Sequence, residues 1–279
     1  MSERRPNVDR ATIDGFGQEW AAFDQTALSE DERQRLFQRY FSIFPFNDLP
    51  ADAEGFDLGC GSGRWAALVA PRVGILHCID PAKAALDVAR RRLVAFPNIR
   101  FHLASADEIS LADGSQDFGY SLGVLHHVPD TQRALTDSVR KLKSGAPFLL
   151  YLYYALDNRP AWFRALWKTS DVIRSGVARL PFQARRVVTT AIAGGIYWPL
   201  SRLAKWAEAR GKDVSGWPLG AYRSLSFYTM RTDALDRFGT RLEQRFTRSQ
   251  IEQMMKVAGL KKIQFSEAEP YWVACGVRA

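Results

Sequence analysis

The stretch Phe56–Trp65, which reads FDLGCGSGRW, holds three glycines at alternate positions, Gly59, Gly61 and Gly63. Asp57 stands two residues before the first glycine. Glycine is unfavourable in regular structure because it loses more backbone freedom on folding than any other residue. Three glycines within five residues therefore predict a backbone that turns sharply or that approaches another group closely.

The chain on both sides of this stretch alternates between strand-like and helix-like patterns. Helical patterns at 82–93 and 131–142 lie between some of the apolar runs. Such alternation predicts a parallel sheet covered on both faces, in which ligands bind at the carboxyl ends of the strands. The glycine-rich stretch ends the first strand, so we expect it at that edge. The apolar runs typical of strands are 56–58, 73–79, 99–103, 118–122 and 148–154.

The spacing of the glycines separates several kinds of nucleotide-binding loop. A dinucleotide-binding fingerprint would read GxGxxG, and a P-loop would need GxxxxGK followed by Ser or Thr. Here the pattern from Asp57 to Gly63 is DxGxGxG, which resembles the glycine loop of class I S-adenosylmethionine (SAM) methyltransferases. A tight strand-to-helix turn that binds no ligand is the alternative for this stretch alone.

Further matches to the same family follow in order along the chain. Asp80 and Pro81 end the second strand, Ala106 and Asp107 follow the third, and GVLHH at 123–127 ends the fourth. The resemblance implies an α/β, Rossmann-like fold with a mostly parallel seven-stranded sheet and an antiparallel last strand. It also implies a transferase that uses SAM and releases S-adenosylhomocysteine, with an α-helical insert after the fifth strand.

The resemblance assigns cofactor-binding roles to particular residues. A carboxylate offers two acceptor oxygens, so Asp80 is expected to bind the two ribose hydroxyls. Asp57 is expected to accept from the ammonium of the amino-acid tail, and the next helix N-terminus to favour the tail carboxylate. Ser105 stands where the family usually has Asp, which leaves Asp107 or the backbone to read the adenine. Trp20 is expected to cover the cofactor, with a plain core tryptophan as the alternative. The full expected set is Trp20, Asp57, Gly59, Cys60, Gly61, Asp80, Pro81, Ala106, Asp107 and Leu122.

One residue is a candidate for proton transfer. Methyl transfer needs a general base only where the acceptor must lose a proton. His126 ends the fourth strand, where the acceptor is expected, and histidine is poised for proton transfer near neutral pH. His126 is therefore the candidate catalytic residue. The alternative is that His126 or His127 holds the loop Val128–Asp130 by hydrogen bonds.

The C-terminal residues are expected to complete the sheet. Apolar runs at 263–265 and 272–277 are typical of the last two strands, paired antiparallel. The helix before them begins with a capping box, in which Thr247 is the N-cap and Gln250 reaches back, and it ends at Gly259.

Residues 157–223 differ in composition from the rest of the chain. They hold 12 Lys/Arg and 4 Asp/Glu, so their excess charge equals the net charge of +8 of the whole chain, and they hold five of its eight tryptophans. Apolar spacing predicts one helix over 162–180 and a second over about 183–210, kinked at Pro199. We interpret this insert as a helical lid over the acceptor, or as a surface for an anionic membrane or a lipid-linked acceptor.

The predicted organisation has four parts. Residues 1–48 form an N-terminal helical lid segment and residues 49–156 the SAM-binding core. Residues 157–228 form the basic, Trp-rich insert, and residues 229–279 complete the core sheet. The three scattered cysteines form neither a disulfide framework nor a metal motif, so no metal is expected. The cytoplasm is the expected location, with the inner face of a membrane as the alternative.

The expected function is SAM-dependent methylation of a small-molecule acceptor. The first alternative is a membrane-surface methyltransferase that acts on a lipid, quinone or glycolipid. A nucleic-acid methyltransferase ranks lower, although the pI of 9.5 favours it, because Ser121–Val124 reads SLGV where base-amino methyltransferases carry Asp/Asn-Pro-Pro-Tyr/Phe. A SAM-binding protein without catalysis, serving as an assembly partner, is a further alternative. The acceptor atom and the oligomeric state are not predicted.

Overall fold

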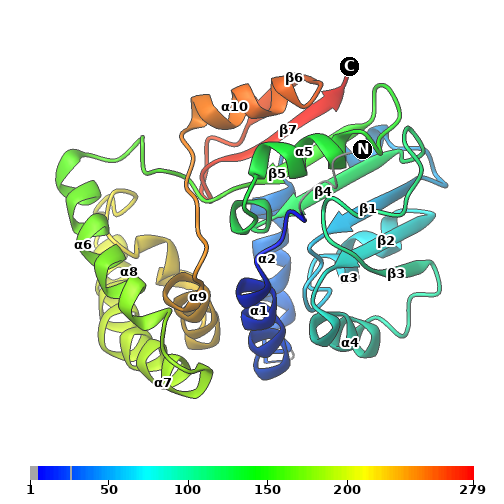
Figure 1. Cartoon of the computed structure of the whole chain (residues 1–279). Coiled ribbons are helices and arrows are strands. Elements are labelled where there is room, and N and C mark those ends of the chain that lie inside the picture. Colours follow the sequence, from blue (N-terminus) through cyan, green and yellow to red (C-terminus); the bar gives the residue numbers. More distant parts are fainter. Residues whose placement is uncertain (1–5, 26) are drawn as a thin grey trace. The chain divides into compact units, whose positions relative to one another are not determined.

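The computed structural model describes residues 6–25 and 27–279, so part of the predicted N-terminal segment 1–48 lies outside the described residues. The chain divides into two compact units (Figure 1). The sheet unit comprises Met1–Asp24, Arg35–Ala155 and Leu242–Ala279. The helical unit comprises Gln25–Gln34 and Leu156–Arg241.

A seven-stranded sheet forms the centre of the sheet unit, with the strand order β3-β2-β1-β4-β5-β7-β6. The pairs from β3 to β5 are parallel, and β7 is antiparallel to both of its neighbours, which confirms the predicted fold class. The carboxyl ends of β1, β2 and β4 therefore lie at one edge. The strands are β1 (Glu54–Leu58), β2 (Ile75–Asp80), β3 (Ile99–Leu103), β4 (Phe118–Leu122), β5 (Pro147–Tyr151), β6 (Leu260–Phe265) and β7 (Val273–Arg278).

Helices cover the sheet because packing against it removes their apolar faces from water. Leu135 of α5 and Ile251 of α10 pack in one buried cluster with Phe56 and Phe148 of the strands. In Figure 1, α5 and α10 lie together against the sheet. The helices of this unit are α1 (Arg10–Ala22), α3 (Ala66–Val69), α4 (Lys83–Arg92), α5 (Thr131–Val139) and α10 (Arg248–Val257), and α2 (Glu30–Phe41) begins in the helical unit and ends in this one.

Element boundaries follow the sequence in some places and depart from it in others: the helix predicted at 131–142 ends at Val139 and the strand predicted at 263–265 begins at Leu260, and two further departures lie near the site. The capping box of α10 is confirmed: Gln250 N donates to Thr247 Oγ1 at 3.2 Å, and Thr247 N donates to Gln250 Oε1 at 2.9 Å. β5 ends at Tyr151 instead of residue 154, because the chain then pairs with Phe246 through hydrogen bonds of residues 153 and 155.

The second departure lies directly after the glycine loop. The helix that follows, α3, has only four residues and continues as a 3₁₀ turn over Ala70–Arg72. A single helical turn has little aligned dipole, so the expected helix-dipole contribution to binding a tail carboxylate is not supported. Pro71 explains the early end, since proline lacks the backbone N–H that a longer helix would use.

The helical unit has its own small core. Val177, Tyr197, Met230 and Phe238 are buried together. The predicted second helix is divided by a π-helical turn over Ala193–Tyr197, and Pro199 lies in the first turn of the helix that follows. The helices of this unit are α6 (Ala161–Val177), α7 (Phe182–Ile192), α8 (Trp198–Glu208) and α9 (Phe227–Gly239).

A buried acid joins the two stretches of the helical unit. Glu32 is 3% exposed, and its Oε1 accepts hydrogen bonds from Ser226 N at 2.9 Å and Thr229 Oγ1 at 2.7 Å. Ser226 is the N-cap of α9, so Glu32 provides negative charge at that helix N-terminus. Within residues 6–25 and 27–279, none of the helices has the length and hydropathy that crossing a membrane requires.

Candidate cofactor site

The glycine loop lies between the end of β1 and α3, and it depends on glycine for two reasons. The backbone φ angles of Gly59, Gly61 and Gly63 are 79°, 53° and 74°, a region that favours glycine. A Cβ atom at Gly59 would lie 2.3 Å from Val124, and one at Gly63 would lie 2.6 Å from Leu93. The loop therefore approaches side chains of its own sheet unit closely, in addition to any ligand.

Asp80, at the end of β2, holds the loop in place. Its Oδ2 accepts from Gly61 N at 2.9 Å and its Oδ1 accepts from Ala82 N at 2.8 Å. Burial raises the pKa of Asp80 to about 6, while the two backbone hydrogen bonds oppose that shift. Each carboxylate oxygen has a second lone pair, so Asp80 keeps the capacity to accept from ribose hydroxyls.

Asp57 is a buried acid beside the loop. It is 2% exposed, and its Oδ2 has no hydrogen-bonding partner among the described residues. Burial raises the pKa of Asp57 to about 8, although the neighbouring Tyr120 and the charge of Arg64 oppose that shift. A cation placed beside this carboxyl would restore its ionised form, so the group fits the ammonium of the cofactor tail.

Trp20 of α1 lies against the glycine loop. A Cβ atom at Gly61 would lie 3.0 Å from the Trp20 indole ring, which is half-buried. The next aromatic residue along α1, Phe16, contacts His127 with 4.9 Å between ring centroids. α1 thus brings aromatic rings to both the glycine loop and the end of β4, the arrangement that a cover over the cofactor requires.

Ala106 and Asp107 follow β3, and the Asp107 carboxylate already accepts several hydrogen bonds within the protein. Its Oδ2 accepts from Asn7 N at 2.8 Å and from Arg133 Nη2 at 2.7 Å, and its Oδ1 accepts from Ser105 Oγ at 2.8 Å. These hydrogen bonds oppose the effect of burial and lower the pKa of Asp107 below its usual range. Asp107 therefore tethers the N-terminal segment, and the backbone beside Ala106 is the better candidate for reading the adenine.

The remaining expected cofactor residues lie around the same edge. Cys60 N donates to the Ile79 carbonyl at 3.1 Å, and interaction with Cys78 together with burial raises the pKa of the Cys60 thiol, so the thiol stays protonated. Pro81 follows β2 directly, and Leu122 is the last residue of β4; both are half-buried.

His126 is enclosed by its neighbours. Its side chain is 0% exposed and stacks on Tyr153 with 3.9 Å between ring centroids. Tyr153 N donates to His126 Nδ1 at 3.3 Å, so the neutral ring carries its proton on Nε2, which has no partner among the described residues. Burial lowers the pKa of His126 well below its usual value. His126 therefore has a structural role against Tyr153, in place of the expected hydrogen bond to the loop Val128–Asp130, and its role as a base stays a hypothesis.

His127 holds the adjacent segment. Its Nδ1 donates to the Leu242 carbonyl at 2.7 Å, and Gln244 Nε2 donates to the Val128 carbonyl at 2.7 Å. Residues 242–246 therefore lie along the end of β4.

Sequence reasoning missed two residues at this edge, Tyr120 and Glu243. Tyr120 is the register partner of Asp57 across β1 and β4, which becomes visible once β4 is placed beside β1. Glu243 pairs with Arg245 at 2.8 Å; its side chain is 2% exposed, and its Oε2 has no partner among the described residues. Nothing in the local sequence signals that Glu243 returns to the sheet unit, because the insert separates it from β5.

These residues together fit SAM. The buried unpaired oxygen of Asp57 suits an ammonium group, Asp80 suits a ribose, and the glycine loop lies between them with Trp20 alongside. Among the described residues, no group of three or more His, Cys, Asp or Glu side chains is arranged to hold a metal ion.

Comparison with known proteins agrees with this geometry. Residues 56–150 match the family model of the methyltransferase domain. An uncharacterised 37.1 kDa transposon protein of Streptomyces fradiae is 30% identical over 52% of this chain and 46% of its own length. The trans-aconitate 2-methyltransferase of Variovorax paradoxus is 29% identical over 61% of this chain and 63% of its own.

The chain therefore spans less than two thirds of either relative. Among solved structures, a possible exported protein from Bordetella parapertussis is similar in fold, with a TM-score of 0.52 and 15% identity over 91% of this chain and 69% of its own. Residues 56–150 are therefore a methyltransferase domain of the class I, SAM-dependent kind, set within the seven-stranded sheet.

Proposed function

We propose that this protein transfers a methyl group from SAM to a small-molecule acceptor. The observation that carries the proposal is the coupling of the glycine loop to Asp80, with the unpaired buried carboxyl oxygen of Asp57 beside it. Each of these three features suits one part of SAM, and a ligand that uses all three must combine a ribose with a cationic group.

The chemistry asks little of the protein beyond alignment. SAM supplies a methyl group that is already activated by its sulfonium charge. The protein has to orient the acceptor and exclude water from the reacting atoms. In this proposal Asp57 holds the tail ammonium, Asp80 holds the ribose, and Trp20 shields the cofactor beside Gly61.

The acceptor class is inferred from chemistry and from relatives. The Variovorax relative is named for a small organic acid, which supports a small-molecule acceptor here. Glu243 and Arg245 bring a buried ion pair to the end of β4, and the Arg245 guanidinium lies 5.0 Å from the Tyr153 ring centroid. Such polar groups suit the orientation of a small polar acceptor.

Tritiated SAM tests the proposal. The full chain should transfer label to compounds in a protein-free small-molecule extract of the source cells. The Asp80→Ala variant should lose most of that transfer, and the Asp87→Ala variant, which removes an acid paired with Lys83 on the surface of α4, should keep it. Equal labelling by all three proteins would refute the assigned site.

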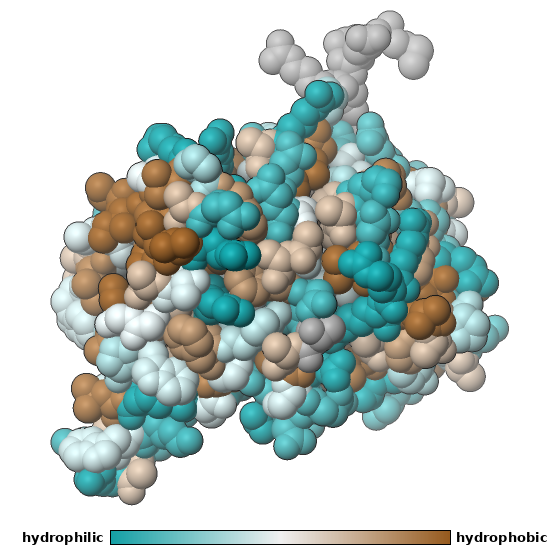
Figure 2. Space-filling model, turned by 90° about the horizontal axis from the view of Figure 1, so that it is seen from below, coloured by the Kyte–Doolittle hydropathy of each residue, from teal (hydrophilic) through white to brown (hydrophobic). Residues whose placement is uncertain are grey.

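A membrane-surface methyltransferase is the second candidate, and exposed apolar side chains favour it. Trp162, Leu166 and Ile173 recur at helical spacing along α6 and are each more than half exposed. Trp206 on α8 is also half exposed, and the Arg210 guanidinium lies 3.6 Å from its ring centroid. Figure 2 shows hydrophobic residues gathered at the left of the view, bordered by hydrophilic ones. Tryptophan beside basic residues suits the interface of an anionic membrane.

A further inference from the structure

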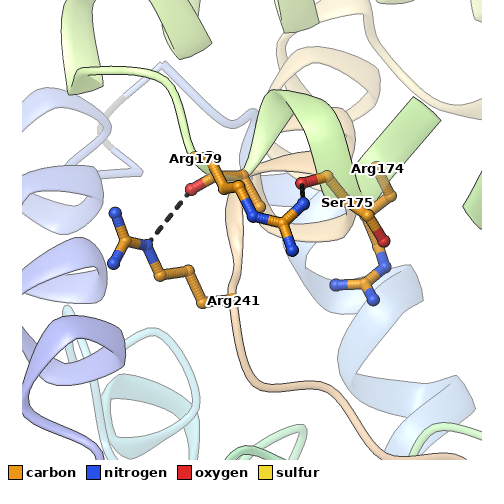
Figure 3. A pocket seen from close by; sticks show the side chains of 5 residues that line it. Arg174, Ser175, Arg179 and Arg241 are labelled. Carbon is orange, nitrogen blue, oxygen red and sulfur yellow. Dashed lines mark hydrogen bonds between the residues drawn. The ribbon is translucent and has the colours of Figure 1, made fainter. Parts of the chain in front are cut away.

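The helical unit contains a cavity with a strongly basic lining. Its volume is about 420 Å³, and it is lined by Arg174, Ser175, Ala178, Arg179 and Arg241 (Figure 3). Sites for small molecules typically measure about 300–1,000 Å³, so this cavity is large enough for more than a single ion.

Two of the three arginines lack a carboxylate partner. Arg174 pairs with Asp171, and its Nη1 donates to the Thr240 carbonyl at 3.0 Å. Among the described residues, neither Arg179 nor Arg241 forms an ion pair. The lining therefore carries two exposed positive charges that no carboxylate of the described residues compensates.

A simpler interpretation is that these side chains only cap α6. Arg179 Nη1 donates to the Ser175 carbonyl at 2.6 Å, and Arg241 Nε donates to the Ala178 carbonyl at 3.4 Å. Basic side chains are favourable at such helix ends. Each guanidinium has five N–H donors, however, and these contacts use one donor of each. Capping does not explain the cavity, whose lining combines arginines of α6 and of the segment after α9.

We propose that this cavity binds the phosphate group of a small molecule. Arginine presents a planar fork of donors that matches phosphate oxygens in pairs, and a phosphate would compensate the charges of Arg179 and Arg241 together. Ala178 adds a small apolar contact for the body of the ligand. The proposal rests on the helical unit alone, so it is independent of methyl transfer in the sheet unit.

Calorimetric titration of the full chain with glycerol 3-phosphate tests the proposal at constant ionic strength. The wild type should bind it, and the Arg179→Gln/Arg241→Gln variant should bind at least about tenfold more weakly, because charge-assisted hydrogen bonds are lost. The matched control is Arg164→Gln/Arg186→Gln, which removes two exposed charges of the same unit outside the cavity and should leave the affinity within about twofold. Equal loss in both variants would show a general charge effect and overturn the proposal.

Further binding experiments distinguish a small-molecule phosphate from the phosphate of a lipid headgroup. Vesicles that contain phosphatidic acid replace glycerol 3-phosphate, with phosphatidylcholine vesicles as the neutral comparison. Binding only to the former, weakened by the cavity variant and not by the control, would reassign the phosphate to a lipid headgroup and contradict a small-molecule ligand. Absence of binding to either probe would also overturn the proposal.

Folding is controlled within the same samples. The melting temperature is compared for all variants, and Arg241→Lys, which keeps the charge and loses the fork, replaces the double variant if that variant unfolds. Weaker binding in Arg241→Lys supports paired recognition, whereas unchanged binding contradicts it. S-adenosylhomocysteine binding is measured in parallel, because its failure would concern the proposed methyltransferase and leave the result for the cavity intact.

Discussion

The amide of Gly61 donates a hydrogen bond of 2.9 Å to Oδ2 of Asp80, 19 residues further along the chain. This bond joins the two motifs that the sequence identified separately. Since Asp80 also accepts from Ala82 N, its carboxylate orientation and the loop conformation determine each other. A change at either residue should therefore affect both the fold of the loop and the binding of a ligand there.

The Gly59→Ala variant should be destabilised by the close approach of Val124. Gly59 has a φ of 79°, and its new Cβ would lie 2.3 Å from the Val124 side chain. The left-handed conformation alone costs about 1–2 kcal/mol, and overpacking adds about 1–3 kcal/mol. Urea unfolding should show a loss within the sum of these ranges.

Gly145→Ala is the matched control for Gly59→Ala. Gly145 has a φ of 83°, and nothing lies within 4 Å of the position that its Cβ would take. This variant should show only the conformational cost, and Val124→Ala should relieve part of the loss in Gly59→Ala. Equal losses at both glycines would mean that the contact with Val124 contributes nothing.

Asp57 should make the stability of the ligand-free protein fall as pH rises. Its pKa is about 8 when folded, so between pH 6 and 8 the folded protein keeps a proton that the unfolded chain has already lost. The free energy of unfolding should then fall by up to about 1.4 kcal/mol per pH unit. Asp80, with a pKa near 6, contributes in the same direction only at lower pH.

Urea unfolding at pH 6, 7 and 8 measures this effect. Asp57→Asn cannot ionise, so its stability should be flatter than that of the wild type across this window. If wild type and variant show the same slope, Asp57 is ionised throughout and its carboxyl is better solvated than the structure indicates.

His126→Ala should mainly lower stability. The change leaves Tyr153 N without its acceptor and removes a stacked ring, so the unsatisfied amide alone should cost about 1–3 kcal/mol. His126→Asn places an amide oxygen near the position of Nδ1 and should recover part of this loss. Methyl transfer per folded molecule should stay within a few-fold of wild type in the Asn variant.

The alternative for His126 has a distinct signature. A general base contributes about 10²–10⁴-fold to the rate. A loss of that size in His126→Asn, with normal unfolding and normal SAM affinity, would assign proton transfer to His126 and contradict the structural interpretation.

Liposome co-sedimentation should show whether the helical unit binds membranes. The membrane candidate predicts binding to anionic vesicles, weak binding to neutral ones, and release at 1 M salt, where screening acts over about 3 Å. Trp162→Ser/Trp206→Ser and Lys168→Gln/Lys205→Gln should each reduce binding, because these side chains are exposed.

Other basic residues of the insert are poor tests of membrane binding. Arg185 Nη1 donates to the Gly239 carbonyl and Arg202 Nη2 donates to the Leu225 carbonyl, so their loss would disturb the unit itself. If the intact chain ignores anionic vesicles at low salt, the membrane candidate is wrong.

Local sequence patterns predicted the sheet well because each strand and turn carries its own signal. The bounds of β3 and β4, the capping box at Thr247 and the end of the helix before Gly259 were all readable from a few neighbouring residues. The short length of α3 was not, although Pro71 was a usable signal.

The contacts around the site were harder to predict because they join distant parts of the chain. Asp107 is engaged by Asn7, 100 residues away, and Glu243 reaches the sheet unit only after the whole insert. His126 appears accessible from its place at a strand end, and only the surrounding residues make it fully buried. Such packing depends on tertiary structure that a single sequence pattern does not encode.

Calorimetric titration of the full chain with S-adenosylhomocysteine tests the central claim most directly. The wild type should bind at one site, and Asp80→Ala should weaken binding by about 1–3 kcal/mol, since charge-assisted hydrogen bonds to the ribose are lost. Asp87→Ala should bind as the wild type does, and circular dichroism should show that each variant is folded. A folded wild type that does not bind S-adenosylhomocysteine, or an Asp80→Ala variant with unchanged affinity, would contradict the account.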